Sequence, residues 1–449
     1  MSYDSAVAQI YALGHELSQT PAHKFDLAHM RVLLAALGHP EKTFPTVLIA
    51  GTNGKGSTGA TLASILQASG LKTGLYTSPH LVRINERIRL NGQPVSDDDF
   101  AVLYDVVDRT AERLVSEGDL PWHPSFFEML TAMGFEYFAR SRPDIAVLEV
   151  GMGGRLDATN VVHPRLSIIT DISLDHQKYL GETVAEIARE KAGIIRPGGV
   201  VVTLPQLPEA NDVIGHAIID AGARAVNAVP YVPPVSPGSA SNLSSDGRNR
   251  YPLEVMGIEI LVDSPLVGRH QLRNLALAIA AAAELHNQGY PQITPQTIAQ
   301  GIRETHWPGR FQVLPATANN PESVFDVAHN PAGAWALRST LSAAYQDSRP
   351  ITMVFGVMRD KAVQEMTEIL FPIAAHVVVT HASNPRAANP EEIRQAAGRV
   401  TAAIDIEAAD DVSSALDRAR EIAGSAGLIV VTGSIYIVGE AMRIQSVRI

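Results

Sequence analysis

The sequence predicts an α/β protein with two domains: a larger N-terminal domain built on a parallel sheet with a small β region beside it, and a smaller α/β C-terminal domain. Three observations predict this class. Apolar runs alternate with amphipathic helical patterns from Thr46 onward, a glycine-rich turn follows the first run, and a second alternating series begins at Val324. The length of 449 residues also exceeds what one hydrophobic core usually organises.

In the N-terminal series, apolar runs predict strands and the patterns between them predict crossover helices. The expected strands are Thr46 to Ala50, Ile145 to Val150, Leu166 to Thr170 and Gly199 to Leu204. The expected helices are Ser57 to Ser69, Phe126 to Arg140 and Thr183 to Ile194, after an amphipathic helix at the N-terminus. Open parallel sheets bind ligands at the carboxyl ends of their strands, so we expect the functional residues there.

Beyond this series, the stretch from Ala228 to Tyr251 is rich in Pro, Ser, Gly and Asn and predicts a surface loop. A hairpin and an alanine-rich helix are expected next, at Leu253 to Met256 with Ile258 to Val262, and at Gln271 to Asn287. Further strands are expected at Val324 to Val327, Ile351 to Phe355, His376 to Thr380 and Leu428 to Val431. Pro308 and Gly309 interrupt the helical pattern between the two series, which places the boundary between domains 1–305 and 306–449.

Composition and charge exclude several classes of protein. Hydrophobic residues make up 46% and charged residues 18%, as in globular proteins, and the net charge of −11 argues against a general nucleic-acid or anionic-membrane surface. The sequence has no cysteine, which excludes disulfides, thiolate zinc sites and cysteine nucleophiles and makes a reducing cytoplasm the expected compartment. The most apolar stretch, Leu275 to Ala283, is too short to span a bilayer and predicts a buried helix.

The glycine-rich turn is the main candidate for phosphate binding. It reads Gly51-Thr52-Asn53-Gly54-Lys55-Gly56-Ser57, between an expected strand and an expected helix. Glycines allow successive N–H groups to face an anion, Lys55 can reach the outer phosphates and the Ser57 hydroxyl can bind Mg²⁺. Gly56 separates the lysine from the serine, unlike the strict Walker A spacing, and a bare glycine turn is the alternative. The strand and helix on either side favour a P-loop NTPase-like domain.

Glu149 ends an apolar strand, where an unpaired carboxylate is costly unless a cation compensates it. A metal ion would supply that cation. A salt bridge with Arg155, or capping of the following turn, is the alternative.

A further group of polar residues follows the next strand. Asp175-His176 and Glu190-Lys191 would each, taken singly, be ordinary structural or solvated residues. Together with Ser57 and Glu149, however, they supply oxygen and imidazole donors at one sheet edge, as Mg²⁺ beside nucleotide phosphates requires.

The first half of the sequence contains the motifs GTNGKGS, TSPHL at Thr77 to Leu81, EVGMGGRLDATN, DHQKYLG and EKAGI. GRHQLRNLALA, WPGRF, DVAHN, GVMRDK and GSIYIVGE follow. With these motifs in this order, the sequence resembles the folylpolyglutamate synthase/dihydrofolate synthase family, within the Mur ligase superfamily. The sequence departs from the family at Val327, where glycine is frequent, and in the longer loop at 228–251. The resemblance implies a Rossmann-like C-terminal domain.

The resemblance also implies roles for individual residues. It implies magnesium ligation by Ser57, Glu149 and His176, carbamylation of Lys191, and a catalytic group made of Lys55, Glu149, His176 and Lys191. It implies ATP contacts at Thr52, Asn53, Gly54, Lys55, Gly56, Ser57, Asn274, Arg310 and Asp326. The implied pterin and glutamate contacts are Thr77, Ser78, Pro79, His80, Phe127, His329 and Asn330.

The implied reaction is ATP-dependent ligation of L-glutamate to dihydropteroate, to folates or to both, through an acyl phosphate, by a cytoplasmic monomer that uses Mg²⁺. Neither nucleic acid nor a membrane is an expected partner. A Mur-type ligase acting on a nucleotide-linked peptide precursor is an alternative, although TSPHL argues against it. A non-catalytic ATP sensor is another, although such a protein would be expected to lack the acid Glu149 or the lysine Lys191, and this sequence has both.

Overall fold

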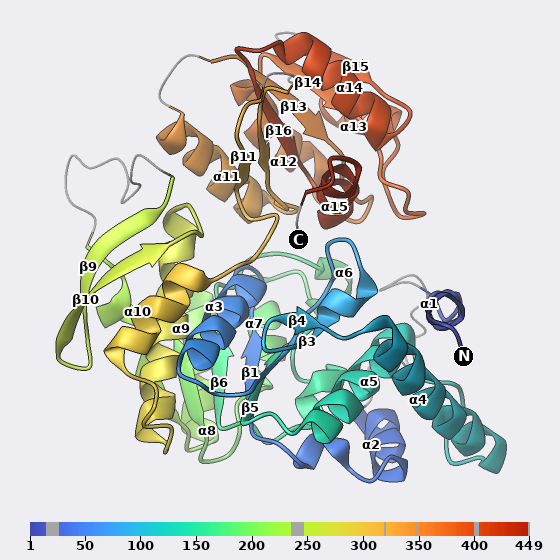
Figure 1. Ribbon diagram of the computed structural model, residues 1–449, viewed down its shortest axis with the longest axis vertical. Helices are drawn as coiled ribbons and strands as arrows, with labels where there is room; N and C mark the ends of the chain where they lie inside the picture. Colours follow the sequence, from blue (N-terminus) through green and yellow to red (C-terminus); the bar gives the residue numbers. More distant parts are fainter. Residues whose placement is uncertain (15–26, 235–246, 318–319, 346–348, 399–403, 448–449) are drawn as a thin grey trace. The chain divides into compact units, whose positions relative to one another are not determined.

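The computed structural model describes residues 1–14, 27–234, 247–317, 320–345, 349–398 and 404–447 (Figure 1). The chain divides into two compact units. The first comprises Met1–Pro233, Pro252–Val262 and Arg273–Thr305, and the second comprises Pro234–Tyr251, Asp263–Leu272 and His306–Ile449.

The sheet of the first unit has eight strands among the described residues, in the order β4-β3-β2-β5-β1-β6-β7-β8. The strands are β1 (Thr46–Ala50), β2 (Thr73–Tyr76), β3 (Ile88–Leu90), β4 (Gln93–Pro94), β5 (Ile145–Glu149), β6 (Leu166–Ile169), β7 (Val200–Thr203) and β8 (Arg224–Asn227). The six from β2 to β8 in this order run parallel, and β3 and β4 form an antiparallel edge. β1 lies between β5 and β6, so the strand order reverses there, and open sheets bind ligands at such a point.

Helices connect and cover these strands. They are α1 (Tyr3–Ala12), α2 (Leu27–Ala36), α3 (Lys55–Ala68), α4 (Asp97–Glu117), α5 (Phe126–Ser141), α6 (Gln177–Leu180), α7 (Val184–Ala192) and α8 (Pro208–Asp220), with short 3₁₀ turns η1 (Pro40–Lys42), η2 (Ile84–Arg87) and η3 (Ala158–Val161). All five residues of β1 and of β5 are buried, as expected for central strands covered on both faces. α3 packs on β1, β2 and β5, so the glycine-rich turn joins a buried strand to a buried helix.

Two further helices, α9 (Arg269–Asn287) and α10 (Pro295–Glu304), follow the hairpin of β9 (Asn249–Val255) and β10 (Ile258–Ser264). α10 lies directly against α3. Ser64 Oγ donates to the carbonyl of Gly301 at 2.7 Å, and a Cβ at Gly301 would lie 2.3 Å from Ile65 Cα. Because real Cβ atoms do not approach this closely, only glycine fits at this crossing.

The second unit holds a six-stranded sheet in the described part of the chain, in the order β11-β12-β16-β13-β14-β15. Its strands are β11 (Gln312–Leu314), β12 (Glu322–Phe325), β13 (Ile351–Phe355), β14 (His376–Val379), β15 (Asp405–Ala408) and β16 (Leu428–Thr432). Only β11 is antiparallel to its neighbour. Its helices are α11 (Pro331–Ala344), α12 (Val363–Leu370), α13 (Pro390–Ala396), α14 (Val412–Ala423) and α15 (Ile435–Ile444), with 3₁₀ turn η5 (Phe371–Ile373).

The predicted fold class is confirmed, because a large, mainly parallel sheet and a second α/β sheet are both present. The surface loop predicted from 228 to 251 is wrong at its C-terminal end. A 3₁₀ turn, η4, spans Val229–Tyr231, and β9 begins at Asn249, with alternate residues buried. Positions 235–246 lie outside the described residues. The expected helix over 275–283 is buried throughout, within α9.

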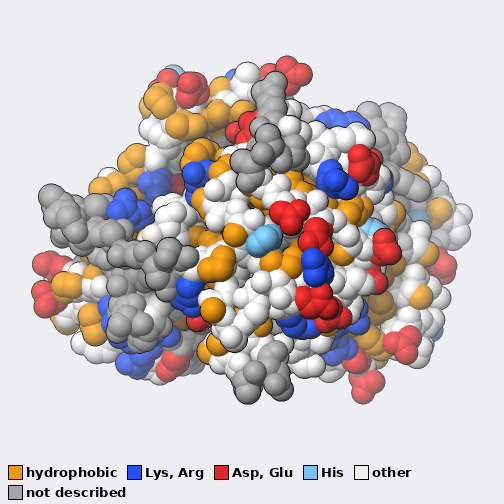
Figure 2. Space-filling view, turned by 90° about the horizontal axis from the view of Figure 1, so that it is seen from above, with side chains coloured by type: hydrophobic (Ala, Val, Ile, Leu, Met, Phe, Trp, Pro, Cys, Tyr) orange, Lys and Arg blue, Asp and Glu red, His pale blue; other side chains and the backbone are white. Residues whose placement is uncertain are grey.

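None of the helices among the described residues is long and apolar enough to cross a membrane. On the face shown in Figure 2, Lys and Arg side chains are interspersed with Asp and Glu side chains rather than gathered into one basic surface.

Candidate active site

The predicted phosphate loop runs from the carboxyl end of β1 to the first turn of α3. Gly54 caps α3 in the left-handed conformation, at φ 89°, which glycine adopts readily. Ser57 lies in the first turn of α3 and is buried. The first N–H groups of a helix lack intrahelical acceptors and carry partial positive charge, so this turn is suited to binding an anion.

Two lysines donate to the same backbone oxygen in this loop. Lys55 Nζ lies 3.0 Å from Gly51 O and 3.1 Å from Thr52 O, and Lys191 Nζ lies 2.8 Å from Gly51 O. Lys191 comes from the last turn of α7 and is buried. The structure therefore brings together two lysines that are 136 positions apart in the sequence (191 − 55). Their like charges favour an anionic group at this place.

The pKa of Lys191 reflects these surroundings. Burial, and after it the charge of Lys55, lowers the pKa of Lys191 from 10.5 to about 7, against the opposing effects of Asp175 and Asp157. Burial disfavours the ammonium form because it removes water from the charge. A neutral amine is therefore accessible near neutral pH at this position.

The loop is bound to the segment that follows β6 through Asp171 and Ser173, two residues that the sequence motifs do not single out. The N–H groups of Thr52 and Asn53 donate to Asp171 O at 2.9 and 3.1 Å. Thr52 Oγ1 donates to Ser173 O at 3.0 Å, and Asn53 Nδ2 donates to Ser173 Oγ at 3.1 Å. Asp171 and Ser173 follow the expected strand Leu166 to Thr170, and this position at a strand end could have indicated them from the sequence.

Asn274 lies against the other end of the loop. A Cβ at Gly54 would be 2.1 Å from Asn274 Oδ1, so the amide occupies the space that a side chain at Gly54 would need. Thr58 Oγ1 donates to Asn274 O at 3.5 Å. The predicted ATP contact at Asn274 is thus placed at the phosphate loop.

Glu149 ends β5, the strand beside β1. Ile49 and Glu149 are register partners, and Glu149 Oε2 accepts from Ser78 N at 3.3 Å. Arg155 does not pair with Glu149, because its guanidinium instead binds Glu190 Oε1, with Nε at 3.1 Å and Nη2 at 2.9 Å. The salt-bridge alternative for Glu149 is therefore wrong.

The segment Thr77 to Leu81 also lies beside Glu149, through Ser78. His80 Nε2 lies 3.1 Å from Tyr11 Oη of α1, and Arg87 Nε donates to His80 Nδ1 at 2.9 Å.

The ring of Phe127 packs against Gly151 in the turn after β5, where a Cβ at Gly151 would lie 2.5 Å from the ring. Residues predicted to line a pterin pocket thus gather at the carboxyl ends of β2 and β5.

His176 is the N-cap residue of α6 and has the left-handed conformation, at φ 51°. Its Nε2 lies 4.0 Å from Asp175 Oδ2. Within the described residues, no three His, Asp or Glu side chains form a metal cluster. The set predicted for Mg²⁺ contains only two such side chains, Glu149 and His176, with the hydroxyl of Ser57. The hard oxygen donors among them suit Mg²⁺.

Four predicted site residues belong to the second unit. Asp326 follows β12 and is buried, and it accepts from Phe311 N and Ala328 N, both at 2.9 Å. Burial raises the pKa of Asp326, and the nearby charge of Arg310 opposes this. His329 Nδ1 lies 3.0 Å from Val327 O, and Asn330 caps α11 through Gly333 N at 2.8 Å.

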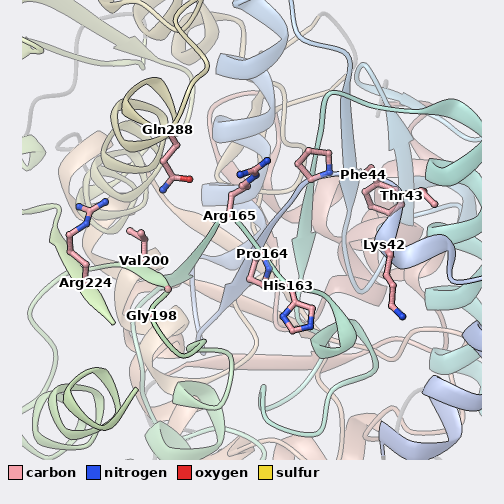
Figure 3. A pocket seen from close by; sticks show the side chains of 12 residues that line it. Lys42, Thr43, Phe44, His163, Pro164, Arg165, Gly198, Val200, Arg224 and Gln288 are labelled. Atoms are coloured by element: carbon pink, nitrogen blue, oxygen red, sulfur yellow. The ribbon is translucent and has the colours of Figure 1, made fainter. Parts of the chain in front are cut away.

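A separate cleft of about 690 Å³ lies at the amino ends of β1, β6, β7 and β8, the sheet edge opposite the phosphate loop (Figure 3). Lys42, His163, Arg165 and Arg224 line it. Arg224 pairs with Glu284 of α9, and the negative ends of crossover helices face this edge of a parallel sheet. Glu284 thus compensates the charge of Arg224, and none of the predicted site residues lines the cleft.

Comparison with known proteins gives consistent matches over nearly the whole chain. Residues 127–282 match the Mur ligase middle domain, and residues 309–435 match the Mur ligase glutamate ligase domain. The chain is 35% identical over 418 residues to a dihydrofolate synthase/folylpolyglutamate synthase of Bacillus subtilis, covering 93% of this chain and 94% of that protein.

Two solved structures are similar in fold. The folylpolyglutamate synthase of Mycobacterium tuberculosis complexed with ADP and AMPPCP superposes with a TM-score of 0.83 at 32% identity, covering 98% of each chain. FolC of Escherichia coli in complex with DHPP and ADP superposes with a TM-score of 0.80 at 29% identity, covering 99% of this chain and 98% of that one.

Proposed function

Because the chain belongs to the dihydrofolate synthase/folylpolyglutamate synthase family of the Mur ligases, we propose that it joins L-glutamate to dihydropteroate, to folates or to both, at the expense of ATP. The observation that carries this proposal is the phosphate loop, where Lys55 and Lys191 both donate to the carbonyl of Gly51. The two solved relatives are complexed with ADP, which supports nucleotide binding by this chain.

The reaction proceeds in two steps. A carboxylate oxygen of the acceptor attacks the γ-phosphorus of ATP, the bond to the bridging oxygen breaks, and ADP leaves. The amine of glutamate then attacks the acyl carbon, phosphate leaves with the electron pair of the C–O bond, and the amine releases a proton. Negative charge spreads over the phosphoryl oxygens, so Lys55 and the N–H groups at the start of α3 hold the group and offset its charge.

Ser57, Glu149 and His176 are the residues that we propose hold Mg²⁺, which would add further positive charge beside the phosphates. Glu149 lies in register beside β1, and Ser57 lies in the first turn of α3. We also propose that Lys191 is carbamylated. Its neutral amine nitrogen bonds to the carbon of CO₂, the nitrogen loses a proton to solvent, and an anionic carbamate results.

The remaining roles follow the two parts of the chain. We propose that residues 1–305 bind ATP and the pterin, the latter through Thr77, Ser78, Pro79, His80 and Phe127. Residues 306–449 then form the glutamate ligase part, with Arg310 and Asp326 contacting ATP, and with His329 and Asn330 contacting glutamate. We propose a cytoplasmic monomer that needs neither nucleic acid nor a membrane.

The test is a ligation assay with purified protein, ATP, Mg²⁺ and labelled glutamate, with dihydropteroate, a folate and a nucleotide-linked peptide precursor supplied in turn. We expect label in an amide product with at least one pterin acceptor, with one ADP formed per bond. ATP cleavage without transfer to either pterin, or transfer to the peptide precursor alone, would refute the assignment.

A further inference from the structure

The phosphate loop is bound by residues that do not belong to it, and the backbone of Asp171 is the first of these. Its carbonyl oxygen accepts two hydrogen bonds from successive loop N–H groups, those of Thr52 and Asn53. The side chain of Thr52 adds a reciprocal pair with the backbone of Ser173, at 3.0 and 3.1 Å. The position of residue 171 therefore determines where the first half of the loop lies.

The carboxylate of Asp171 is held by the guanidinium of Arg273, at the start of α9. Arg273 Nε lies 3.0 and 2.9 Å from the two carboxylate oxygens, and Nη2 lies 2.5 Å from Oδ1. Nη2 also donates to Pro205 O at 2.8 Å, beyond the end of β7. A planar guanidinium that donates to several acceptors fixes the orientation of the carboxylate and also neutralises its charge. A lysine would only neutralise the charge.

Arg273 is the neighbour of Asn274, whose amide lies against Gly54 at the other end of the loop. One turn of α9 thus reaches both halves of the phosphate loop: the first half through Asp171, and the second half directly. Both side chains of the ion pair are about one-third exposed, at 32% and 34%, so the charge attraction alone is modest. The importance of the pair lies in the backbone that it holds.

We propose that Asp171 and Arg273 are positioning residues that hold the phosphate loop in its nucleotide-binding shape before ATP arrives. This inference rests on the proposed function only in taking the loop to bind nucleotide. Neither residue needs to touch ATP. We call the ion pair of Asp171 and Arg273 the clamp. A loop that is already ordered loses less conformational entropy when it binds the nucleotide, so the clamp contributes to nucleotide affinity rather than to the chemical step.

The test compares Arg273→Met with Arg224→Met. Arg224 pairs with Glu284 of the same helix, α9, but at the amino edge of the sheet, so this control removes an ion pair from α9 without touching the loop. We expect Arg273→Met to raise the Kd for ADP, measured by calorimetry, about ten-fold. The KM for ATP should rise by a similar factor while kcat and the KM for glutamate change less than about two-fold. Arg224→Met should leave all four values unchanged.

Arg273→Lys is the control for a general loss of folding. Lysine keeps the positive charge but lacks the planar guanidinium that bonds to both carboxylate oxygens of Asp171. We expect an intermediate rise in the Kd for ADP, with a circular dichroism melting curve like that of the wild type. An unchanged Kd for ADP in Arg273→Met, or an equal rise in Arg224→Met, would overturn the clamp. The calorimetric arm needs no acceptor, so the clamp can hold even if the ligation assay fails.

Discussion

At the scale of single residues, the feature that most constrains the chemistry is the amine of Lys191, which is buried and lies 2.8 Å from Gly51 O. A buried lysine beside another lysine costs stability as an ammonium, and becomes useful once it is neutral or carbamylated. Substitutions of Lys191 should therefore change both the turnover of the enzyme and the stability of the fold.

We expect Lys191→Ala to lower kcat about 10²-fold, by removing the anion that the carbamate would supply. A small carboxylate can enter the space left by the side chain, so added acetate should restore part of the turnover. The measurement is ADP release with and without acetate, with sodium chloride at equal ionic strength as the control. Absence of rescue in a protein that still melts cooperatively would count against the carbamate.

The stability of Lys191→Met should depend on pH in a defined direction. The pKa falls from 10.5 in the unfolded chain to about 7 in the folded one, so the unfolded state binds the extra proton between these values and the wild type gains stability as pH rises from 7. In bicarbonate-free buffer, the Tm advantage of Lys191→Met should therefore be largest near pH 6 and decline toward pH 9. A constant Tm difference would show that Lys191 does not titrate in this range.

Motifs that lie within one stretch of sequence were predictable, because their spacing alone defines them. The loop at Gly51, the carboxylate Glu149 at the end of a strand and the helix that carries Lys191 are all where the sequence places them. The partner of Asp171 was not predictable, because Arg273 lies 102 positions away and nothing in either local pattern distinguishes this pair from surface charges.

At the scale of elements, the position of the phosphate loop depends on the packing of α10 against α3, the helix that follows the loop. α10 crosses α3 at Gly301 without room for a side chain, and the atoms in the way belong to the backbone of Ser64 and Ile65. Backbone atoms cannot rotate aside, so any larger residue must push the helices apart.

We expect Gly301→Ala to destabilise the protein by about 1–3 kcal/mol, as overpacking does, and to raise the KM for ATP because α3 carries the phosphate loop. Gly215→Ala in α8 is the matched control, since nothing lies within 4 Å of its Cβ position. That change should be neutral, or stabilising by up to about 1 kcal/mol. Urea unfolding of both variants measures this, and equal stabilities would contradict the close crossing.

Element prediction succeeded where strands are central and apolar. β1 and β13 have the predicted bounds, and β5 and β6 end within one residue of them. Edge strands were missed because their residues carry little apolar signal, and the short strand β2 was missed as well although it is buried inside the sheet. β4 is a two-residue exposed strand, and β8 has no fully buried residue. Pairing with a neighbouring strand, rather than burial, defines such strands.

At the scale of the whole molecule, the second unit has its own hydrophobic core. Apart from Val267, the buried members of this cluster among the described residues lie between Phe311 and Val430. A stretch with its own core can fold independently.

We therefore expect a fragment of residues 306–449 to unfold cooperatively, with a lower Tm than the same part of the full chain because it lacks Val267. Thermal unfolding followed by circular dichroism checks this, and Val267→Ala in the full chain is the control for the missing side chain. A fragment without a cooperative transition would refute 306–449 as a domain.

The division of the chain into units has a consequence for how the molecule holds together. The backbone passes between them five times, after residues 233, 251, 262, 272 and 305. No single break in the backbone divides the chain into two pieces that each correspond to one unit. A chain cut once at any of the first four of these positions should therefore give two bands in a denaturing gel and still behave as one particle in native buffer.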